Sequence, residues 1–459
     1  MEQPENPAEQ PILSDRVIIN GSETPLTLTV DGKLRMWERG QRCLTVEKEV
    51  LGFVTEGSKI RIRTVVKGGG AGICCVASKG ALVRKDFVFQ PLSNDSLNLW
   101  SQKLRQYIDS LETQYQLHAK EVASSLDLSK YDGIVCVSGD GILVEVINGL
   151  LEREDWEAAI KMPIGVVPAG TGNGMVKSLL DSAGYPCTAP NAVLTIIQGH
   201  KRSLDVATIL QRETKFFSIL MLAWGMLDFT CTGLVADIDI ESEKYRWMGS
   251  ARIDFYGLQR ILHLRQYNGC VSFVPAPGFE TYGEPTSYPN KSTGKPDSCS
   301  PSEEESIKVR HHGYQGPNID LENLEWRTIS GPFVSVWLHN VPWGSEGTLA
   351  APDAKFSDGY LDLIIMRDCP QLALMSLMTG LNDGSHVKSP HVTYLKVKAF
   401  VLEPGPQTKE PTKEGIIDSD GEVLARGKGT YKCDQKAPMA YDKLQIAVHQ
   451  GLATLFSPF

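Results

Sequence analysis

Two short apolar runs, each ending in a glycine-rich loop, constrain the fold of this chain more than any other feature of its sequence. The first run is Gly133–Val137, followed by the loop Ser138–Gly141, and the second is Ile164–Val167, followed by the loop Pro168–Gly174. Neither run alternates with polar residues, which is typical of strands buried on both faces of a parallel sheet. Because the two units are spaced like one βαβ unit, ~30 residues, we predict a nucleotide crevice at the carboxyl ends of two parallel strands.

The first loop carries an aspartate, Asp140, at a place that would otherwise favour anions. Backbone N–H groups at the start of the following helix have no partner within that helix and attract phosphate, and the flanking glycines let phosphate approach the backbone closely. Asp140 fits this loop if it faces the acceptor and takes the proton from an attacking hydroxyl. The alternative is that Asp140 caps a helix in a tight turn.

Composition and charge exclude several classes of protein. The chain has 459 residues, of which 42% are hydrophobic and 22% charged, enough for two or three globular domains. A net charge of −9 gives no basic footprint for nucleic acid. The ten cysteines lack metal-ligand spacing, which indicates free thiols in a reducing compartment. The acidic N-terminus has no secretory h-region, and no apolar run approaches the ~18 residues of a membrane-spanning helix.

Upstream of the glycine loops, we predict a disordered tail over residues 1–16 and a β module over residues 17–111. Asp31-Gly32 is a hairpin signal, and Ile60–Val66 alternates with period 2. Ser93 fits the N-cap of a helix. The apolar face of that helix would consist of Leu97, Trp100, Leu104, Ile108 and Leu111. Several strands closed by one amphipathic helix resemble a pleckstrin-homology (PH)-like module, which would be either a docking domain for membranes or partners or a structural β domain.

A third segment, Ala236–Arg252, is charged and by itself would be the solvated face of a helix. In chain order, however, Ser-Gly-Asp-Gly, Pro-Ala-Gly-Thr-Gly-Asn and Ala-Asp-Ile-Asp-Ile-Glu-Ser-Glu-Lys-Tyr-Arg resemble the sphingosine kinases. The resemblance is to the plant-type sphingoid long-chain base kinases, relatives of the diacylglycerol kinase catalytic-domain families. Asp358–Leu363 and Asp420–Glu422 also fit this pattern, which extends from the N-terminal module to about Pro458.

This resemblance implies a fold class and a domain order. We expect an α/β nucleotide-binding kinase domain and a C-terminal antiparallel β-sandwich, preceded by the N-terminal PH-like β module. The kinase domain, which is incomplete here, would occupy residues 112–205, and the lipid-binding β-sandwich would occupy residues 206–459. Within the sandwich, residues 275–323 are rich in Pro, Gly, Ser and Glu and are predicted to be a disordered insertion.

The resemblance also implies an activity. The family transfers the γ-phosphate of ATP to the primary hydroxyl of a sphingoid base, such as sphingosine or phytosphingosine, to give the 1-phosphate. ATP and Mg²⁺ would be the cofactors, with Mg²⁺ held mostly by phosphates and water. The partners would be a sphingoid base lipid and, peripherally, an intracellular membrane such as the vacuolar membrane, reached from the cytoplasm. No nucleic-acid partner is expected, and a homodimer is left open.

Residue roles follow from the same resemblance. Asp140 would be the general base, Ser138 and Gly139 would also border the substrate, and Asp239 would bind the ammonium of the sphingoid base. The residues expected around the nucleotide are Thr113, Ser138, Gly139, Gly141, Glu145, Gly170, Thr171, Gly172, Arg246, Arg252, Asp420, Gly421 and Glu422. The two arginines would clamp phosphate oxygens with planar guanidinium groups. The stripe Leu372–Met378 would either wall an acyl tunnel or pack in the core.

Two stretches depart from the family pattern. In the family, the helix that ends near Leu111 is followed by a strand, an Asn-Pro and Gly-Gly-Lys type phosphate loop, a helix and a second strand. Here Leu111 runs directly into Glu112 and Thr113, and no such loop occurs in the chain. The missing unit would be ~30–40 residues long. In addition, Met226–Gly233 lengthens the connection between the third segment and the Ala-Trp-Gly that precedes it.

These departures leave three hypotheses. A lost buried strand removes about five apolar side chains at ~1.5–3 kcal/mol each, which is comparable to the stability of a whole domain. Phosphoryl transfer depends on positioning and charge stabilisation, so we expect a sphingoid base kinase by descent with little or no activity in this chain. The alternatives are a non-catalytic variant that binds lipid or a partner, and a related kinase for diacylglycerol or ceramide, which lack the free ammonium that Asp239 suits.

Overall fold

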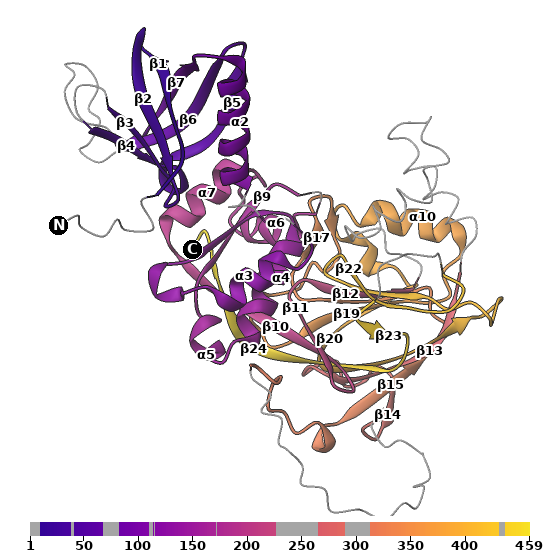
Figure 1. The fold of residues 1–459 in the computed structure, drawn as a ribbon. Helices are drawn as coiled ribbons and strands as arrows, with labels where there is room; N and C mark the ends of the chain where they lie inside the picture. Colours follow the sequence, from indigo (N-terminus) through magenta and orange to yellow (C-terminus); the bar gives the residue numbers. More distant parts are fainter. Residues whose placement is uncertain are drawn as a thin grey trace, which may run out of the picture. The chain divides into compact units, whose positions relative to one another are not determined.

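The computed structural model describes residues 10–37, 41–67, 82–109, 113, 115–170, 172–225, 265–289, 313–430 and 437–459. The chain forms two compact units, Met1–His118 and Ala119–Phe459. Each unit has its own hydrophobic core. Figure 1 shows the strands and helices of both.

The first unit is an antiparallel sheet with one long helix. Its seven described strands are hydrogen-bonded in the order β4-β3-β2-β1-β7-β6-β5. The elements are β1 (Pro11–Ile19), β2 (Ser22–Thr29), β3 (Lys33–Trp37), β4 (Gln41–Thr45), α1 (Val46–Glu49), β5 (Val50–Glu56), β6 (Lys59–Lys67), β7 (Leu82–Pro91) and α2 (Asn94–Asp109). The predicted arrangement, several strands closed by one amphipathic helix, is confirmed.

Local sequence signals explain why these elements form. The predicted turn joins β2 to β3, where Gly32 has a φ of 69° that favours glycine. Strand β6 buries Ile60 and Ile62 on one face, as its alternation predicts. The hydroxyl of Ser93 accepts a hydrogen bond from the Ser96 N–H at 3.1 Å, so the predicted cap of α2 is confirmed. Trp100, from this helix, is fully buried.

The predicted disordered tail is too long. Residues Pro11–Arg16 belong to β1, which pairs with β2 from Pro11↔Thr29 to Ile19↔Ser22. The segment pairs because its backbone continues the ladder of Val17 and Ile19, which are both buried in the core. A proline at the first position of a strand does not interrupt such a ladder. Residues 1–9 lie outside the described ranges.

The second unit is built on one large sheet. Its main path is β11-β10-β24-β20-β19-β16-β12-β21-β22-β23, and β13, β14 and β15 extend it from β20. The strands are β8 (Ile134–Ser138), β9 (Ile164–Pro168), β10 (Lys201–Gln211), β11 (Thr214–Ser218), β12 (Met221–Gly225), β13 (Tyr267–Pro275), β14 (Glu284–Thr286), β15 (Trp326–Ser330), β16 (Ser335–His339), β17 (Trp343–Ser345), β18 (Thr348–Leu349), β19 (Leu361–Met366), β20 (Val392–Gln407), β21 (Ile416–Ser419), β22 (Glu422–Arg426), β23 (Met439–Ala440) and β24 (Leu444–Phe456).

The helices of the unit are α3 (His118–Ser125), η2 (Leu128–Lys130), α4 (Asp140–Glu152), α5 (Trp156–Ala159), α6 (Gly174–Asp181), α7 (Ala189–Gln198), η4 (Leu321–Asn323), α10 (Gln371–Gly380) and η5 (Ser385–Lys388). Helices α3 to α7 gather around β9, whereas α10 lies at the far side of the unit (Figure 1). No helix in the described ranges is both long and apolar enough to cross a membrane.

The α/β part and the β part share a single sheet. Strands β8 and β9 are parallel, from Ile134↔Ile164 to Ser138↔Pro168, and β9 joins the long strand β24 through Leu455↔Ile164. The predicted fold class, an α/β part followed by antiparallel β structure, is therefore confirmed. The shared sheet fixes the glycine loops after β8 and β9 against the β-rich part, which sequence patterning does not reveal.

The predicted disordered insertion over residues 275–323 is wrong for its described parts. Residues Glu284–Thr286 form β14 and pair with β15. Tyr314 is buried, its hydroxyl lies 2.7 Å from His449 Nδ1, and its ring contacts Trp156 and Phe217. A few aromatic side chains thus bury enough surface to order a segment of low overall hydrophobicity. Residues 290–312 lie outside the described ranges.

Strand β8 is open along one edge. Among the described strands it pairs with β9 alone. The Ile134 N–H donates to Pro163 O at 3.0 Å and Ser138 O accepts from the Ala169 N–H, so alternate residues of β8 direct their backbone groups toward β9. Val135 and Val137 therefore direct theirs to the other side, and their side chains are 48% and 65% exposed. A parallel strand is normally covered on both faces, whereas no described element pairs with this edge of β8.

We predict that the exposed valines promote self-association without contributing to stability. Val137→Thr should change the free energy of unfolding by less than about 0.5 kcal/mol while lowering light scattering by the purified chain, because a polar edge strand pairs less readily with another chain. The matched control is Val166→Thr on β9, where the side chain is buried and a buried hydroxyl without a partner costs ~1–3 kcal/mol. Equal destabilisation by the two substitutions in urea unfolding would contradict the open edge.

Candidate active site

The loops after β8 and β9 lie in direct backbone contact. The Asp140 N–H donates to Gly172 O at 3.1 Å. A Cβ atom on Gly170 would lie 2.3 Å from Gly139 Cα, and a Cβ on Gly139 would lie 2.7 Å from Gly172 O. Both distances are shorter than any side chain tolerates, so these glycines are required by loop-to-loop packing. Around Gly141, in contrast, a Cβ would meet nothing within 4 Å.

Asp140 links the two loops through its side chain. It begins α4, yet its carboxylate accepts hydrogen bonds from the N–H groups of Gly174 at 2.7 Å and Met175 at 3.0 Å, in the first turn of α6. Asp140 is therefore a helix cap, as the alternative interpretation held, but it caps α6 and not α4, the helix that it begins. Each carboxylate oxygen keeps a second lone pair, so capping does not prevent Asp140 from accepting a proton.

Asp420 comes from a distant hairpin to the same region. It lies with Gly421 in the turn between β21 and β22, where φ is 55° and 87°, respectively. Its buried carboxylate accepts hydrogen bonds from the N–H groups that join β11 to β12. The three donors are Ile219 at 3.1 Å, Leu220 at 2.8 Å and Met221 at 2.8 Å. These hydrogen bonds hold the turn of Asp420 and Gly421 against the connection between β11 and β12, and its role beside the nucleotide stays a prediction.

Burial is the main cause of a raised pKa at both aspartates. Burial raises the pKa of Asp140 to about 6. The hydrogen bonds from Met175 and Gly174 act in the opposite direction, and the charge of Asp420 makes a small further contribution to the rise. Burial also raises the pKa of Asp420 to about 6. A carboxyl group with a pKa near the working pH is suited to take a proton from a substrate hydroxyl.

Two asparagines hold the loops in place and were not assigned a role from the sequence. Asn173 donates to Gly170 O at 3.0 Å and to the Glu346 carboxylate at 2.6 Å, which fastens the second glycine loop to β17–β18. Asn148, on α4, exchanges two hydrogen bonds with the backbone of Phe217. Both side chains are buried. The sequence signal for such a role is an asparagine that lies within or directly after an apolar run, where a polar side chain is unexpected.

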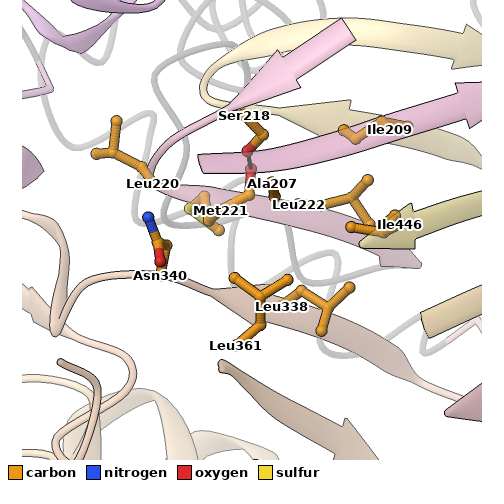
Figure 2. Close-up of a pocket in the computed structure, with 10 residues that line it drawn as sticks. All are labelled: Ala207, Ile209, Ser218, Leu220, Met221, Leu222, Leu338, Asn340, Leu361 and Ile446. Carbon is orange, nitrogen blue, oxygen red and sulfur yellow. Dashed lines mark hydrogen bonds between the residues drawn. The ribbon is translucent and has the colours of Figure 1, made fainter. Parts of the chain in front are cut away.

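A small cavity lies inside the sheet beside the residues that bind Asp420 (Figure 2). It is lined by Ala207, Ile209, Ser218, Leu220, Met221, Leu222, Leu338, Asn340, Leu361 and Ile446. Its polar groups are the Ser218 hydroxyl and the Asn340 amide. The free volume is about 10 Å³, which holds no more than about one water molecule. A lipid tail does not fit this cavity as it stands.

The remaining predicted residues have diverse positions. Ser138 ends β8 beside Ala169, as expected. The Glu145 carboxylate accepts from the Ala119 N–H at 3.1 Å, at the start of α3. Glu422 is exposed at the start of β22. Thr113 belongs to the first unit and precedes α3, which begins at His118, so it is not in that helix. The residues that lie outside the described ranges are Thr171, Asp239, Arg246, Arg252 and the Met226–Gly233 stretch.

The apolar stripe Leu372–Met378 forms most of α10. Leu374 and Leu377 are buried in the core of the second unit, whereas Leu372 is 82% exposed and Met375 is 45% exposed. Core packing therefore accounts for one face of this helix, and the acyl-tunnel role stays a prediction. For metals, the described residues contain no cluster of three His, Cys, Asp or Glu side chains that could hold an ion.

Comparison with known proteins agrees with this geometry. Residues 94–209 match the diacylglycerol kinase catalytic domain, and residues 316–439 match the YegS C-terminal NAD kinase beta sandwich-like domain. Sphingosine kinase 1 of Arabidopsis thaliana is 61% identical over 488 positions, covering 97% of this chain and 96% of the relative. Sphingosine kinase 2 of Arabidopsis thaliana is 58% identical over 489 positions, covering 97% of each. Human sphingosine kinase 1 is 32% identical, covering 68% and 76%.

The length of the first alignment bears on the missing unit. It spans 488 positions, and the covered 97% of this chain's 459 residues fill about 445 of them, so about 43 positions remain. At least that many positions of the relative therefore have no counterpart here. This number is close to the size expected for one strand–loop–helix–strand unit, and the open edge of β8 is where such a unit would pair.

The buried carboxyl of Asp140 predicts an unusual dependence of stability on pH. Its pKa is about 6 in the folded chain, against 3.8 for an unperturbed aspartate, so between these values the folded state binds the extra proton. The free energy of unfolding contributed by this group therefore falls as pH rises from about 4 to about 6. The free energy of unfolding of the parent chain, measured in urea relative to that of Asp140→Asn, should fall by about 3 kcal/mol between pH 4 and pH 7. Ser138→Ala is the control, and a parent-minus-variant difference that is constant with pH would contradict the shift.

Proposed function

Because the chain belongs to the sphingosine kinase family, we propose that its site is built to transfer the γ-phosphate of ATP to the primary hydroxyl of a sphingoid base. The observation that carries this proposal is the position of Asp140, a buried carboxylate with a raised pKa between two glycine loops in contact. The same chemistry is supported by the family of the chain, by its match to a lipid kinase catalytic domain and by the contact between its two glycine loops.

In this proposal Asp140 acts as the base on the acceptor side. A free lone pair on its carboxylate takes the proton of the substrate hydroxyl, and the oxygen that is freed forms a bond to the γ-phosphorus as the bond to the ADP oxygen breaks. The N–H groups of Gly174 and Met175 hold the carboxylate in place, so little reorganisation is needed. Asp420 keeps the neighbouring β11–β12 turn rigid through its three hydrogen bonds.

ATP is implied by the kinase family, and Mg²⁺ would accompany it to neutralise phosphate charge. In this proposal Mg²⁺ is held mainly by the phosphates of the nucleotide and by water. Asp239 would pair with the ammonium of the sphingoid base, and Arg246 and Arg252 with phosphate oxygens. As sphingoid bases reside in membranes, the chain would act from the cytoplasm at an intracellular membrane surface. A homodimer stays a prediction.

We further propose that the donor side is incomplete in this chain. The family's first phosphate loop would lie on a strand beside β8, and here that edge is open, with exposed Val135 and Val137. Because the loop would supply N–H donors to the transferred phosphate, its loss removes charge stabilisation in the transition state. The same observation favours a second function, a non-catalytic protein that keeps the acceptor side and binds lipid or a partner.

The first test compares this chain with a restored one. The restored chain carries, between Leu111 and Glu112, the residues that Arabidopsis thaliana sphingosine kinase 1 has at that junction. We expect its kcat/KM for sphingosine to exceed that of the 459-residue chain at least about 100-fold, since single donors to a developing charge are worth 10²–10³. A flexible Gly/Ser insert of equal length is the control for chain length.

The outcomes separate the two proposals. Activity in the restored chain that disappears in Asp140→Asn supports the acceptor role of Asp140. Robust phosphorylation of sphingosine by the 459-residue chain, or equal activation by the Gly/Ser insert, would show that the donor side is not missing. Sphingosine binding to the 459-residue chain without ATP turnover would favour the non-catalytic function.

The raised pKa of Asp140 also predicts the pH profile of the restored chain. The base must be ionised to accept a proton, so the single-turnover rate should rise with pH through about 6 and then level off. ATP affinity measured at each pH is the control, because the nucleotide titrates in a similar range. A rate that stays constant from pH 5 to pH 8, after correction for ATP binding, would rule out Asp140 as the base.

A further inference from the structure

The second unit has a surface groove that the candidate active site does not use. Its volume is about 520 Å³, within the range of ligand sites, ~300–1,000 Å³. The groove lies between α6, the start of β10, the β17–β18 hairpin and the segment that leads into β19. It is lined by Ser178, Asp181, Ser182, Arg202, Pro342, Trp343, Leu349, Pro352, Ala354, Lys355, Phe356, Ser357 and Asp358.

One guanidinium group is held in a fixed position in this groove. Arg202 lies over the rings of Phe356 and Phe459, with its guanidinium carbon 4.9 Å from each ring centroid. Its Nη1 donates to the Ser182 hydroxyl at 3.3 Å, and the described part of the chain gives this guanidinium no carboxylate partner. Burial lowers the pKa of Arg202, as expected for a cation without a compensating charge. Several of its N–H donors therefore have no acceptor among the described residues.

The other charges of the groove leave it positive. Lys355 is exposed and has no ion pair with any described residue. Both carboxylates that line the groove have a lysine partner. Asp181 accepts from Lys177 at 2.7 Å, and Asp358 accepts from Lys396 at 2.9 Å, a lysine that it shares with the buried Asp362. Asp181 also accepts from Trp343 Nε1 at 3.0 Å. Arg202 and Lys355, which have no ion pair among the described residues, thus face a groove whose two lining carboxylates are each bound to a lysine.

The groove is distinct from the candidate active site. Asp140 binds the first turn of α6, at Gly174 and Met175, whereas the groove includes Asp181 and Ser182 at the opposite end of that helix. Eight residues of helix separate Gly174 from Ser182, which is ~12 Å along the axis. An anion held by Arg202, beside Ser182, therefore lies at the end of α6 that is remote from Asp140. Trp343, in contrast, lines the groove nearer to Gly174.

We propose that this groove binds an amphiphilic anion, a single phosphate or carboxylate group on an apolar body. A planar guanidinium offers paired N–H donors that match the two oxygens of either group, and Lys355 adds a second positive charge. The side chains of Leu349, Pro352 and Ala354 provide an apolar wall for the body of the ligand. The anion has two conceivable sources, a soluble small molecule or the headgroup of an acidic phospholipid.

The test uses the full 459-residue chain and calorimetric titration with octyl phosphate and octanoate, with octanol as the uncharged probe. We expect both anions to bind and octanol not to bind. Arg202→Gln should weaken anion binding at least about tenfold, because a hydrogen bond to a charged group is worth ~1.5–3 kcal/mol. Arg202→Lys keeps the charge but loses the planar guanidinium group, so its affinity for the anions should lie between that of the parent chain and that of Arg202→Gln. Arg212→Gln is the matched control, since Arg212 follows the other end of β10 and is exposed.

A second variant keeps the proposal testable if Arg202→Gln fails to fold. Lys355→Gln alters an exposed side chain and should weaken anion binding about twofold to fivefold, the effect of one solvent-exposed charge. The proposal is overturned if octanol binds as tightly as octyl phosphate, or if Lys355→Gln and a folded Arg202→Gln bind anions as Arg212→Gln does.

Vesicles identify the source of the anion. Co-sedimentation is measured with phosphatidylcholine vesicles, with and without phosphatidylserine, for the parent chain and Arg202→Gln. Binding that requires both phosphatidylserine and Arg202 supports the groove as a headgroup site. Vesicle binding that is independent of Arg202, together with Arg202-dependent binding of octyl phosphate, supports the groove as a site for a soluble anion.

Discussion

The contact between the loops that follow β8 and β9 is the constraint on which the rest of the site depends. Gly139 and Gly170 approach so closely that neither position has room for a Cβ atom. This contact places the Asp140 carboxylate at the first turn of α6, and it fixes the spacing of the two helices that begin at these loops. Because β9 also joins β24 in the shared sheet, the loops are held against the β-rich part that brings Asp420.

Much of this arrangement could be predicted from local sequence. The apolar runs without polar alternation predicted parallel strands, and Ser93 and Asp31-Gly32 predicted a helix start and a hairpin that the structure confirms. The partner of Asp140 could not be predicted, because the helix that it caps begins 34 residues away in the sequence. Residues 11–16 and 313–323 were wrongly predicted to be disordered. The first segment is ordered by pairing with β2, and the second by the ring contacts of Tyr314.

The acceptor side and the donor side of the site are not equally complete. Asp140, Asp420 and the second glycine loop have the hydrogen bonds that hold them in place without any ligand. Beside β8, in contrast, Val135 and Val137 present apolar side chains and outward-directed backbone groups at an edge that the described strands leave open. About 43 positions of the alignment with the Arabidopsis thaliana relative have no residue of this chain, a number close to the size of one strand–loop–helix–strand unit.

The central claim is that the missing unit pairs along β8, and amide hydrogen exchange tests it most directly. The amides of Val135 and Val137 should exchange rapidly in the 459-residue chain and become strongly protected when the relative's segment is inserted between Leu111 and Glu112, while Ile134, whose N–H donates to Pro163 O, should be protected in both. Equal protection of the two valines before and after the insertion would show that the edge of β8 is not where the missing unit belongs.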